Sequence, residues 1–112
     1  MIIKKSERKK FSNSPVCTAY EYPFEDKDIN IAFIEINGRY PDKGRIVNKV
    51  CKELVFIVKG KGKIEIDDKN ILLEEGDSVF IQSNQKYFFE GNISIIASCH
   101  PTWYPEQHKE CD

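Results

Sequence analysis

The sequence predicts an all-β protein, folded as a double-sheet jelly roll or small barrel. Between Lys52 and Asn92 it holds four short apolar runs, separated at close intervals by glycine, aspartate, serine and asparagine. These residues are the usual punctuation of antiparallel hairpins. No window shows a sustained helical period with capping residues, so little helix is expected. About eight or nine short strands at hairpin spacing are typical of jelly rolls and small barrels.

The elements are expected to be short and joined mainly by tight turns. Residues 12–15 are expected to form a loop, and residues 39–44 and 67–70 have the composition of turns. The run at 29–38 has apolar side chains on both faces, which is typical of a strand that is covered on both sides. In chain order, the expected strands are 16–22, 29–38, 45–50, 52–58, 63–66, 71–73, 78–82, 86–89 and 93–99.

Alternation in the strand after Lys52 predicts two faces of different character. One face carries Glu53, Val55 and Ile57, and the other carries Leu54, Phe56 and Val58. A carboxylate that faces a barrel interior needs a partner, because an unpaired buried charge is costly. The second, wholly apolar row needs cover beyond one small sheet, so a homodimer is expected.

Two segments of this stretch resemble the signature of the cupins. Their first motif places a His-x-His pair before a glutamate and a glycine, and Glu53 and Gly60 have the required separation. Their second motif begins with a glycine, matched by Gly76, and has a histidine where this chain has Tyr87. The His-x-His slots hold Ile46 and Asn48, or Val47 and Lys49 with the shorter spacing, so every motif histidine is replaced.

The resemblance covers about residues 39–103 and implies one cupin domain over 1–112. Its core would be about 29–100, folded as a double-stranded β-helix, or jelly roll, with the N-terminal strands and C-terminal tail packed on it. It also implies a site at the wide end of the barrel, where Asn48, Glu53 and Tyr87 converge, with Cys51 and Phe89 near them.

The function that the resemblance favours is binding of a small polar molecule in the barrel. It extends to a metal-independent activity like that of sugar isomerases and epimerases, with Glu53 as acid or base and Tyr87 as hydrogen-bond donor. The alternatives are a metal-dependent cupin enzyme, such as a dioxygenase or isomerase with unusual ligands, and a non-catalytic sensory or interaction module. Without motif histidines no cofactor is expected; a divalent metal would need Glu53 together with His100.

Four further residues have competing interpretations. Arg39 and Arg45 lie near the expected barrel mouth, where an arginine suits a carboxylate or phosphate of a ligand, or pairs with Glu53 itself. Cys51 is expected to be a packed thiol rather than a nucleophile, because no spacing supplies it with a base. His100 is expected at the surface before Pro101, the alternative being an inward side chain beside Glu53.

The polar C-terminal tail is expected to contribute little to the site. His108 is expected to be solvated, while Trp103 and Tyr104 are expected to cover the sheet or a dimer contact rather than to bind ligand.

Composition excludes several classes of partner. The chain has 17 basic and 18 acidic side chains and a net charge of −1, which argues against nucleic acid as a partner. No apolar run approaches the ~20 residues needed to cross a bilayer, so no membrane partner and a cytoplasmic location are expected. The four cysteines lie too far apart for a CxxC motif and are expected to be free thiols.

Overall fold

The computed structural model of the protein describes residues 1–112 and is built almost entirely from strands. The strands are β1 (Lys9–Ser14), β2 (Cys17–Glu21), β3 (Asn30–Tyr40), β4 (Arg45–Asn48), β5 (Lys52–Ile66), β6 (Lys69–Glu74), β7 (Ser78–Ile81), β8 (Lys86–His100) and β9 (His108–Cys111). Two 3-10 turns, η1 (Lys5–Glu7) and η2 (Pro105–Gln107), are the only helical segments, which confirms the all-β prediction. Neither has the length or hydropathy of a transmembrane helix.

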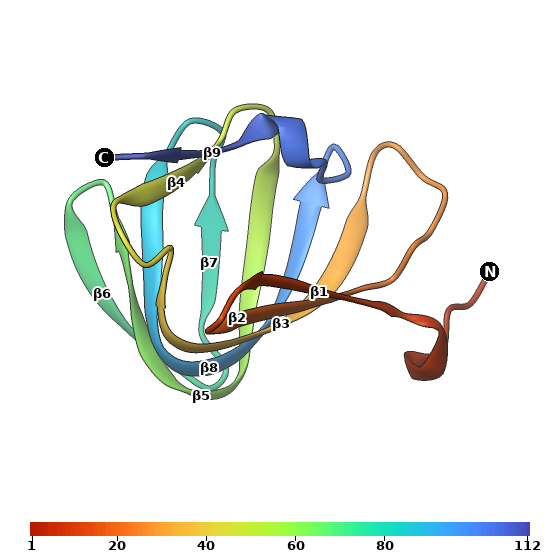
Figure 1. Ribbon diagram of the computed structural model, residues 1–112, viewed down its shortest axis with the longest axis horizontal. Coiled ribbons are helices and arrows are strands. Elements are labelled where there is room, and N and C mark those ends of the chain that lie inside the picture. The colour runs from red at the N-terminus through yellow and green to blue at the C-terminus, as the bar shows by residue number, and fades with distance from the viewer.

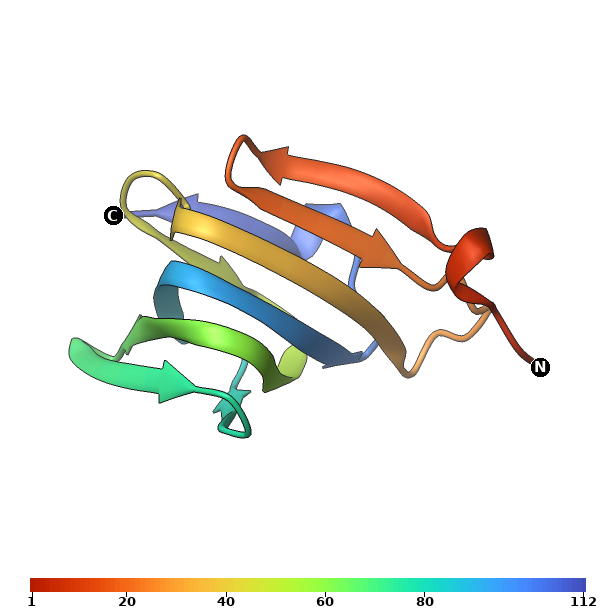
Figure 2. The ribbon, with the colours of Figure 1, turned by 90° about the horizontal axis from the view of Figure 1, so that it is seen from below.

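All nine strands belong to one hydrogen-bonded sheet that curls on itself, the jelly roll predicted from the sequence (Figure 1). Its main path runs β1, β2, β3, β8, β4, β9, and β5 pairs with β6, β7 and β8. β8 is therefore the central strand, because different parts of it pair with β3, β4 and β5. Figure 2 shows β1, β2, β3, β8 and β5 side by side in one layer.

β5 and β8 are each one continuous strand of 15 residues, so the expected shorter strands within 52–66 and 86–99 are wrong in their boundaries. Glycine is usually a turn signal, but Gly62 and Gly91 face each other inside the β5–β8 pair. A Cβ atom on Gly91 would lie 2.4 Å from the Gly62 Cα. These glycines allow two long strands to approach closely, instead of ending them.

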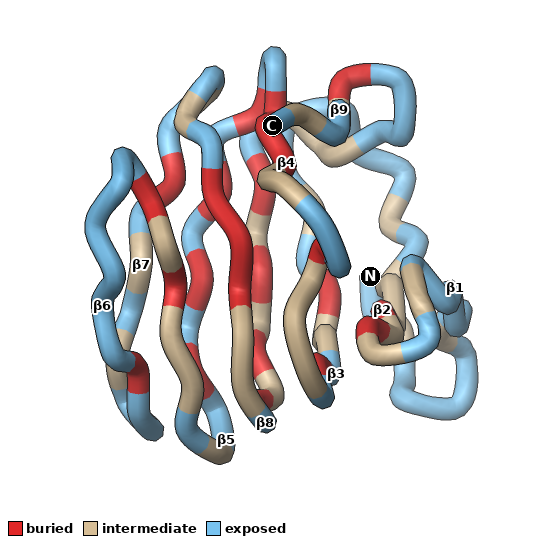
Figure 3. Tube along the Cα trace, turned by 60° about the vertical axis from the view of Figure 1, so that its left-hand side comes forward, coloured by how far each residue is buried: buried red, intermediate tan, exposed pale blue.

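The predicted register of β5 is confirmed. Glu53, Val55 and Ile57 are buried, whereas Leu54, Phe56 and Val58 are exposed by 59%, 48% and 40%. The register with β8 shifts between Ile57 and Lys59, and beyond this bulge the buried positions become Ile64 and Ile66. Figure 3 shows buried segments recurring along both long strands.

Two strands at the ends of the chain were not predicted. β1 includes most of the segment expected to be a loop at 12–15, and it pairs with β2 as an edge hairpin. β9 lies in the tail and pairs with β4, which places His108 opposite Asn48. The turn between β5 and β6 is also tighter than expected: Asp67 and Asp68 both have positive φ, as in a two-residue hairpin loop.

Candidate active site

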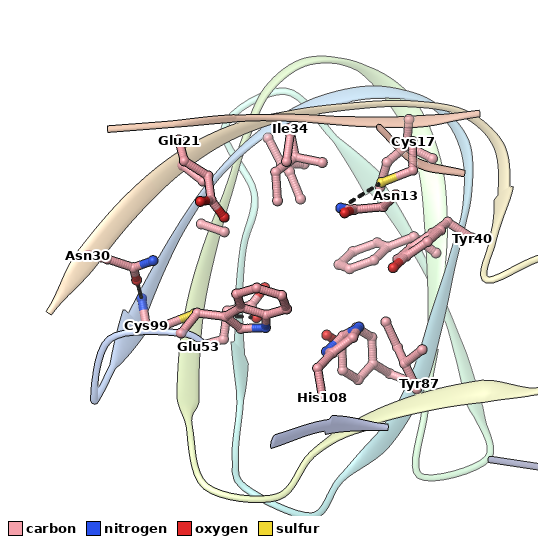
Figure 4. A pocket seen from close by; sticks show the side chains of 18 residues that line it. Asn13, Cys17, Glu21, Asn30, Ile34, Tyr40, Glu53, Tyr87, Cys99 and His108 are labelled. Atoms are coloured by element: carbon pink, nitrogen blue, oxygen red, sulfur yellow. Dashed lines mark hydrogen bonds between the residues drawn. The ribbon is translucent and has the colours of Figure 1, made fainter. Parts of the chain in front are cut away.

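A cavity of about 160 Å³ opens inside the curled sheet, between β2, β3, β5, β8 and the C-terminal segment (Figure 4). Of its 18 lining residues 13 are hydrophobic, so a bound molecule contacts mainly apolar walls and few polar groups, as is usual for small-molecule sites. The side chains that bring oxygen, nitrogen or sulfur to the lining are Asn13, Cys17, Glu21, Asn30, Tyr40, Glu53, Tyr87, Cys99, Trp103 and His108.

Glu53 lies near the start of β5 and is 7% exposed. Its Oε1 accepts a hydrogen bond from Asn48 Nδ2 at 3.2 Å and another from the Cys99 thiol at 3.6 Å. Burial raises the pKa of the Glu53 carboxyl, and the two hydrogen bonds offset part of that rise. Glu53 therefore keeps its proton to a higher pH than an exposed glutamate does.

The orientation of the Asn48 amide follows from a chain of hydrogen bonds that starts at the backbone. Gln107 Oε1 accepts from the N–H groups of Val50 and Cys51, each at 3.1 Å, so the Gln107 Nε2 is the group that donates to Asn48 Oδ1, also at 3.1 Å. His108 Nδ1 lies 2.9 Å from the same Asn48 oxygen. Because an amide oxygen only accepts, His108 Nδ1 must carry a proton.

His108 is thereby held with its other ring nitrogen, Nε2, free to accept a proton. This nitrogen makes no hydrogen bond within the chain, and the imidazole lines the cavity beside Trp103, with 5.5 Å between ring centroids. Burial lowers the pKa of His108 from the ordinary value of 6.5, so the imidazole is neutral at neutral pH.

Tyr87 completes this group through the other side of Asn48. Asn48 Nδ2 lies 3.5 Å from the Tyr87 hydroxyl oxygen and donates to it, which leaves the phenol proton available to another acceptor. Burial raises the pKa of Tyr87 well above 10, and the nearby Glu53 raises it further, so the phenol stays neutral. The ring packs edge-on against Phe89, with centroids 5.7 Å apart.

The structure brings together four of the residues singled out from the sequence. Glu53, Tyr87 and Phe89 line the cavity, and Asn48 is fully buried just behind its wall, where it contacts Glu53 and Tyr87. Their convergence follows from β4, β5 and β8 being neighbours in the sheet.

Three other candidates do not line the cavity. Arg39 donates to the carbonyl oxygens of Pro41 and Gly44 and stacks on a phenylalanine ring. Arg45 pairs with Glu65 instead of Glu53. Cys51 is fully buried, its thiol 3.9 Å from the Thr102 carbonyl oxygen, and burial raises its pKa.

The donor set does not fit a transition metal. No three of the histidine, cysteine, aspartate and glutamate side chains form a group that could hold a metal ion. Burial and the neighbouring Glu53 raise the pKa of the Cys99 thiol far above its ordinary value, which disfavours the thiolate that a metal needs. His100 is exposed and turns its Nδ1 to the Asp28 carbonyl oxygen at 2.6 Å, so it does not reach Glu53.

Several cavity residues were missed. The expectation that His108 is solvated is wrong, because β9 folds back onto β4 and buries most of the ring. Trp103 lines the cavity, and a tryptophan in a polar tail was a usable sign that the tail packs on the barrel. Glu21 follows Cys17 and Ala19 in alternation, which could have placed it on the inner face of β2.

The sequence and the fold each match known proteins. Residues 40–94 match the sequence model of the cupin domain. No curated protein sequence matches the chain.

Among solved structures, Streptomyces Pac13, described as a unique nucleoside dehydratase, matches with a TM-score of 0.89 at 12% identity, over 99% of this chain and 90% of that one. An RmlC-like cupin from Shewanella frigidimarina matches with a TM-score of 0.75 at 13% identity, over 89% of each chain. HppE with Fe(II) matches with a TM-score of 0.76 at 16% identity, over 88% of this chain and 59% of that one. At these identities the likeness shows a shared fold.

Proposed function

The chain belongs to the cupin family, and we propose that it binds a small polar molecule in the barrel and catalyses proton transfer on it without a metal. The reaction class is isomerisation, epimerisation or loss of water beside a carbonyl group. The observation that carries the proposal is the buried Asn48 amide, which holds a carboxyl, an imidazole and a phenol at one wall of the cavity.

In this mechanism His108 is the base and Glu53 is the acid. Nε2 of the neutral imidazole takes the proton from a carbon next to the ligand's carbonyl group, while the Tyr87 phenol donates a hydrogen bond to the carbonyl oxygen as it gains charge. Protonation of the resulting enolate by Glu53 on the opposite face of the same carbon gives the epimer. In a hydroxy-carbonyl ligand, the isomer forms when Glu53 protonates the former carbonyl carbon and the proton of the neighbouring hydroxyl group passes to the former carbonyl oxygen. If Glu53 instead protonates a hydroxyl group on the next carbon, water leaves.

The pKa shifts of the two groups support these roles. Burial raises the pKa of Glu53 and lowers that of His108, so both shifts favour a protonated acid beside an unprotonated base. Asn48 is a positioning residue, because it sets the tautomer of His108 without lining the cavity.

One structural neighbour supports a reaction of this class. Pac13 is described as a nucleoside dehydratase, and structures of its variants were solved with uridine. Loss of water needs a base and an acid at neighbouring atoms, which His108 and Glu53 supply here. The Fe(II) of HppE has no counterpart in this proposal, because no three of the histidine, cysteine, aspartate and glutamate side chains of this chain form a group that could hold a metal ion.

A deuterium-exchange experiment tests the proposal even though the substrate is unidentified. A panel of small hydroxy-aldehydes, hydroxy-ketones and nucleoside aldehydes is incubated with chelator-treated protein in D₂O and followed by proton NMR. We expect deuterium to enter beside the carbonyl group of at least one compound. Glu53→Gln and His108→Asn should each slow its conversion by ~100-fold or more, as for loss of a general acid or base.

Glu35→Gln is the matched control, because Glu35 lies on the outer face of β3, between the inward-facing Ile34 and Ile36. It should convert the same compound at the wild-type rate. Normal conversion by Glu53→Gln, no conversion of any compound, or complete loss of wild-type activity in the chelator would contradict the mechanism.

A further inference from the structure

The cavity has acidic groups but no basic side chain that carries a fixed positive charge. Glu21 and Glu53 line it, the neutral His108 is the only basic group, and neither lysine nor arginine is present in the lining. A phosphate or carboxylate moved from water into such a space loses its hydration and finds no cation to replace it. Beside an ionised Glu21 it would also be repelled.

The two arginines that were expected near the barrel mouth, Arg39 and Arg45, already have partners within the chain. Arg39 uses two guanidinium nitrogens on backbone carbonyls, at 2.6 and 2.9 Å, and its guanidinium carbon lies 3.8 Å from the centroid of the Phe88 ring. Arg45 is paired with Glu65 and Asp68. The fold also has no α-helix whose N-terminus could hold an anion.

Glu21 is the one carboxyl of the lining without a partner. It ends β2 on the inner face, and Figure 4 shows its carboxyl directed into the cavity from the wall across from His108. It makes no hydrogen bond or ion pair within the chain. Lys9 lies opposite it in the β1–β2 register, but Lys9 is exposed, forms no ion pair with it and does not line the cavity.

The two glutamates therefore differ in how many hydrogen bonds they can still accept from a ligand. Glu53 already accepts hydrogen bonds from Asn48 and Cys99, whereas both oxygens of Glu21 are free to accept. Asn30 also lines the cavity: its Oδ1 accepts from the Cys99 backbone N–H at 3.0 Å, so its amide nitrogen is available to a ligand. Glu21 is half-buried, and this burial raises the pKa of its carboxyl.

We propose that Glu21 determines ligand specificity: it accepts a hydrogen bond from a hydroxyl or amino group of the ligand and excludes ligands that carry a phosphate or carboxylate. This inference rests on the proposed function, since the ligand concerned is the substrate of the Glu53 and His108 pair. The substrate class is thereby narrowed to molecules without an anionic group, such as free sugars or nucleosides instead of their phosphates or uronic acids.

Three probes of similar size and shape, benzyl alcohol, benzylamine and benzoate, test directly whether the cavity excludes an anionic ligand. Each is titrated at pH 8 into ¹⁵N-labelled protein, and the amide signals of Ile34 and Ala97, two apolar lining residues, report on binding. We expect the alcohol or the amine to bind at least ~10-fold more tightly than benzoate, because like charges at close range oppose binding. Tighter binding of benzyl alcohol would identify a hydroxyl as the preferred donor, and tighter binding of benzylamine would identify an ammonium group.

Glu21→Gln is the decisive variant, because it removes the charge and keeps the size. It should improve the affinity for benzoate at least ~5-fold, and so lower the ratio of the affinity for the alcohol or amine to the affinity for benzoate. Glu35→Gln, on the outer face of the neighbouring strand, should leave this ratio unchanged. Equal binding of benzoate in the wild-type protein, a ratio insensitive to Glu21→Gln, or no binding of any probe would overturn the inference. This experiment measures binding and no turnover. The specificity role of Glu21 can therefore fail while the acid–base mechanism stands, and the mechanism can fail while the specificity role stands.

Discussion

At the scale of single residues, Asn48 decides the chemistry of the site. It occupies one of the positions where the family motif has a metal-binding histidine, and here its amide bonds to Glu53, Tyr87, Gln107 and His108. An amide cannot replace imidazole as a strong metal ligand, but it can donate on one side and accept on the other. This two-sidedness lets one residue bring an acid and a base into one hydrogen-bonded group.

Removing that amide should be costly. Asn48→Leu keeps the branched shape of the side chain but removes its polar atoms. Gln107 Nε2 then loses its acceptor and Glu53 keeps only the Cys99 thiol as a donor, and each such loss of a buried hydrogen bond costs about 1–3 kcal/mol. We expect the free energy of unfolding in urea to fall by ~3 kcal/mol or more. Asn70→Leu, at an exposed position of β6, should change it by less than ~0.5 kcal/mol. Equal effects of the two substitutions would show that the Asn48 bonds do not stabilise the fold.

Glu53 should make stability depend on pH in a defined direction. Its folded pKa is raised above the ordinary value of 4.5, so the folded state holds the proton more tightly than the unfolded state does. Stability should then fall as pH rises from 4.5 through the raised pKa, and stay lower above it. Glu53→Gln removes this dependence, so the melting temperature of the variant should drop less than that of the wild type between about pH 5 and about pH 8. A larger drop in the variant would mean that Glu53 is stabilised as an anion.

At the scale of elements, the fold depends on β5 and β8 remaining continuous and close. Gly91 has a φ of +137°, and a Cβ there would lie 2.7 Å from the Lys61 carbonyl oxygen as well as against Gly62. Gly91→Ala should therefore force the two longest strands apart. We expect a loss of ~3 kcal/mol or more in unfolding free energy, as for other strained or overpacked core positions.

Gly76 is the matched control for this substitution. It also has positive φ, at +91°, but nothing lies within 4 Å of where its Cβ would be. Gly76→Ala should cost only the backbone strain, about 1–2 kcal/mol. If Gly76→Ala destabilises as much as Gly91→Ala, the close approach of the strands is not what Gly91 provides.

The sequence was informative where a signal is local and not where it depends on distant pairing. Alternation within one strand was enough to orient Glu53, and motif spacing was enough to bring Tyr87 to it. The place of His108 depends on β9 pairing with β4, far away in the sequence, and a short polar segment at the end of a tail carries no periodic signal for that. The glycines led to wrong strand boundaries for a related reason. Gly91 lies in close contact with Gly62 inside a continuous pair of strands, and only the register of that pair shows it.

At the scale of the whole molecule, one outer face lacks cover. Leu54, Phe56 and Phe80 are each about half exposed, and Leu54 lies opposite Phe80 in the β5–β7 pair. We predict that a second copy of the chain covers this face, because contiguous exposed apolar side chains usually mark an interface. Sedimentation at micromolar concentration should give twice 13.0 kDa, and Phe56→Lys should give 13.0 kDa with the cavity intact. A wild-type monomer would contradict this prediction.

The central claim is that the Asn48 amide holds His108 as a neutral base with its free nitrogen in the cavity. The most direct test is a long-range ¹H–¹⁵N NMR spectrum of the histidine side chains near pH 7, assigned with His100→Gln and His108→Asn. The claim predicts that His108 is neutral and protonated on Nδ1, and that Asn48→Leu disturbs this state. A charged His108, or one protonated on Nε2, would contradict it, because the ring could then take no proton from a molecule in the cavity.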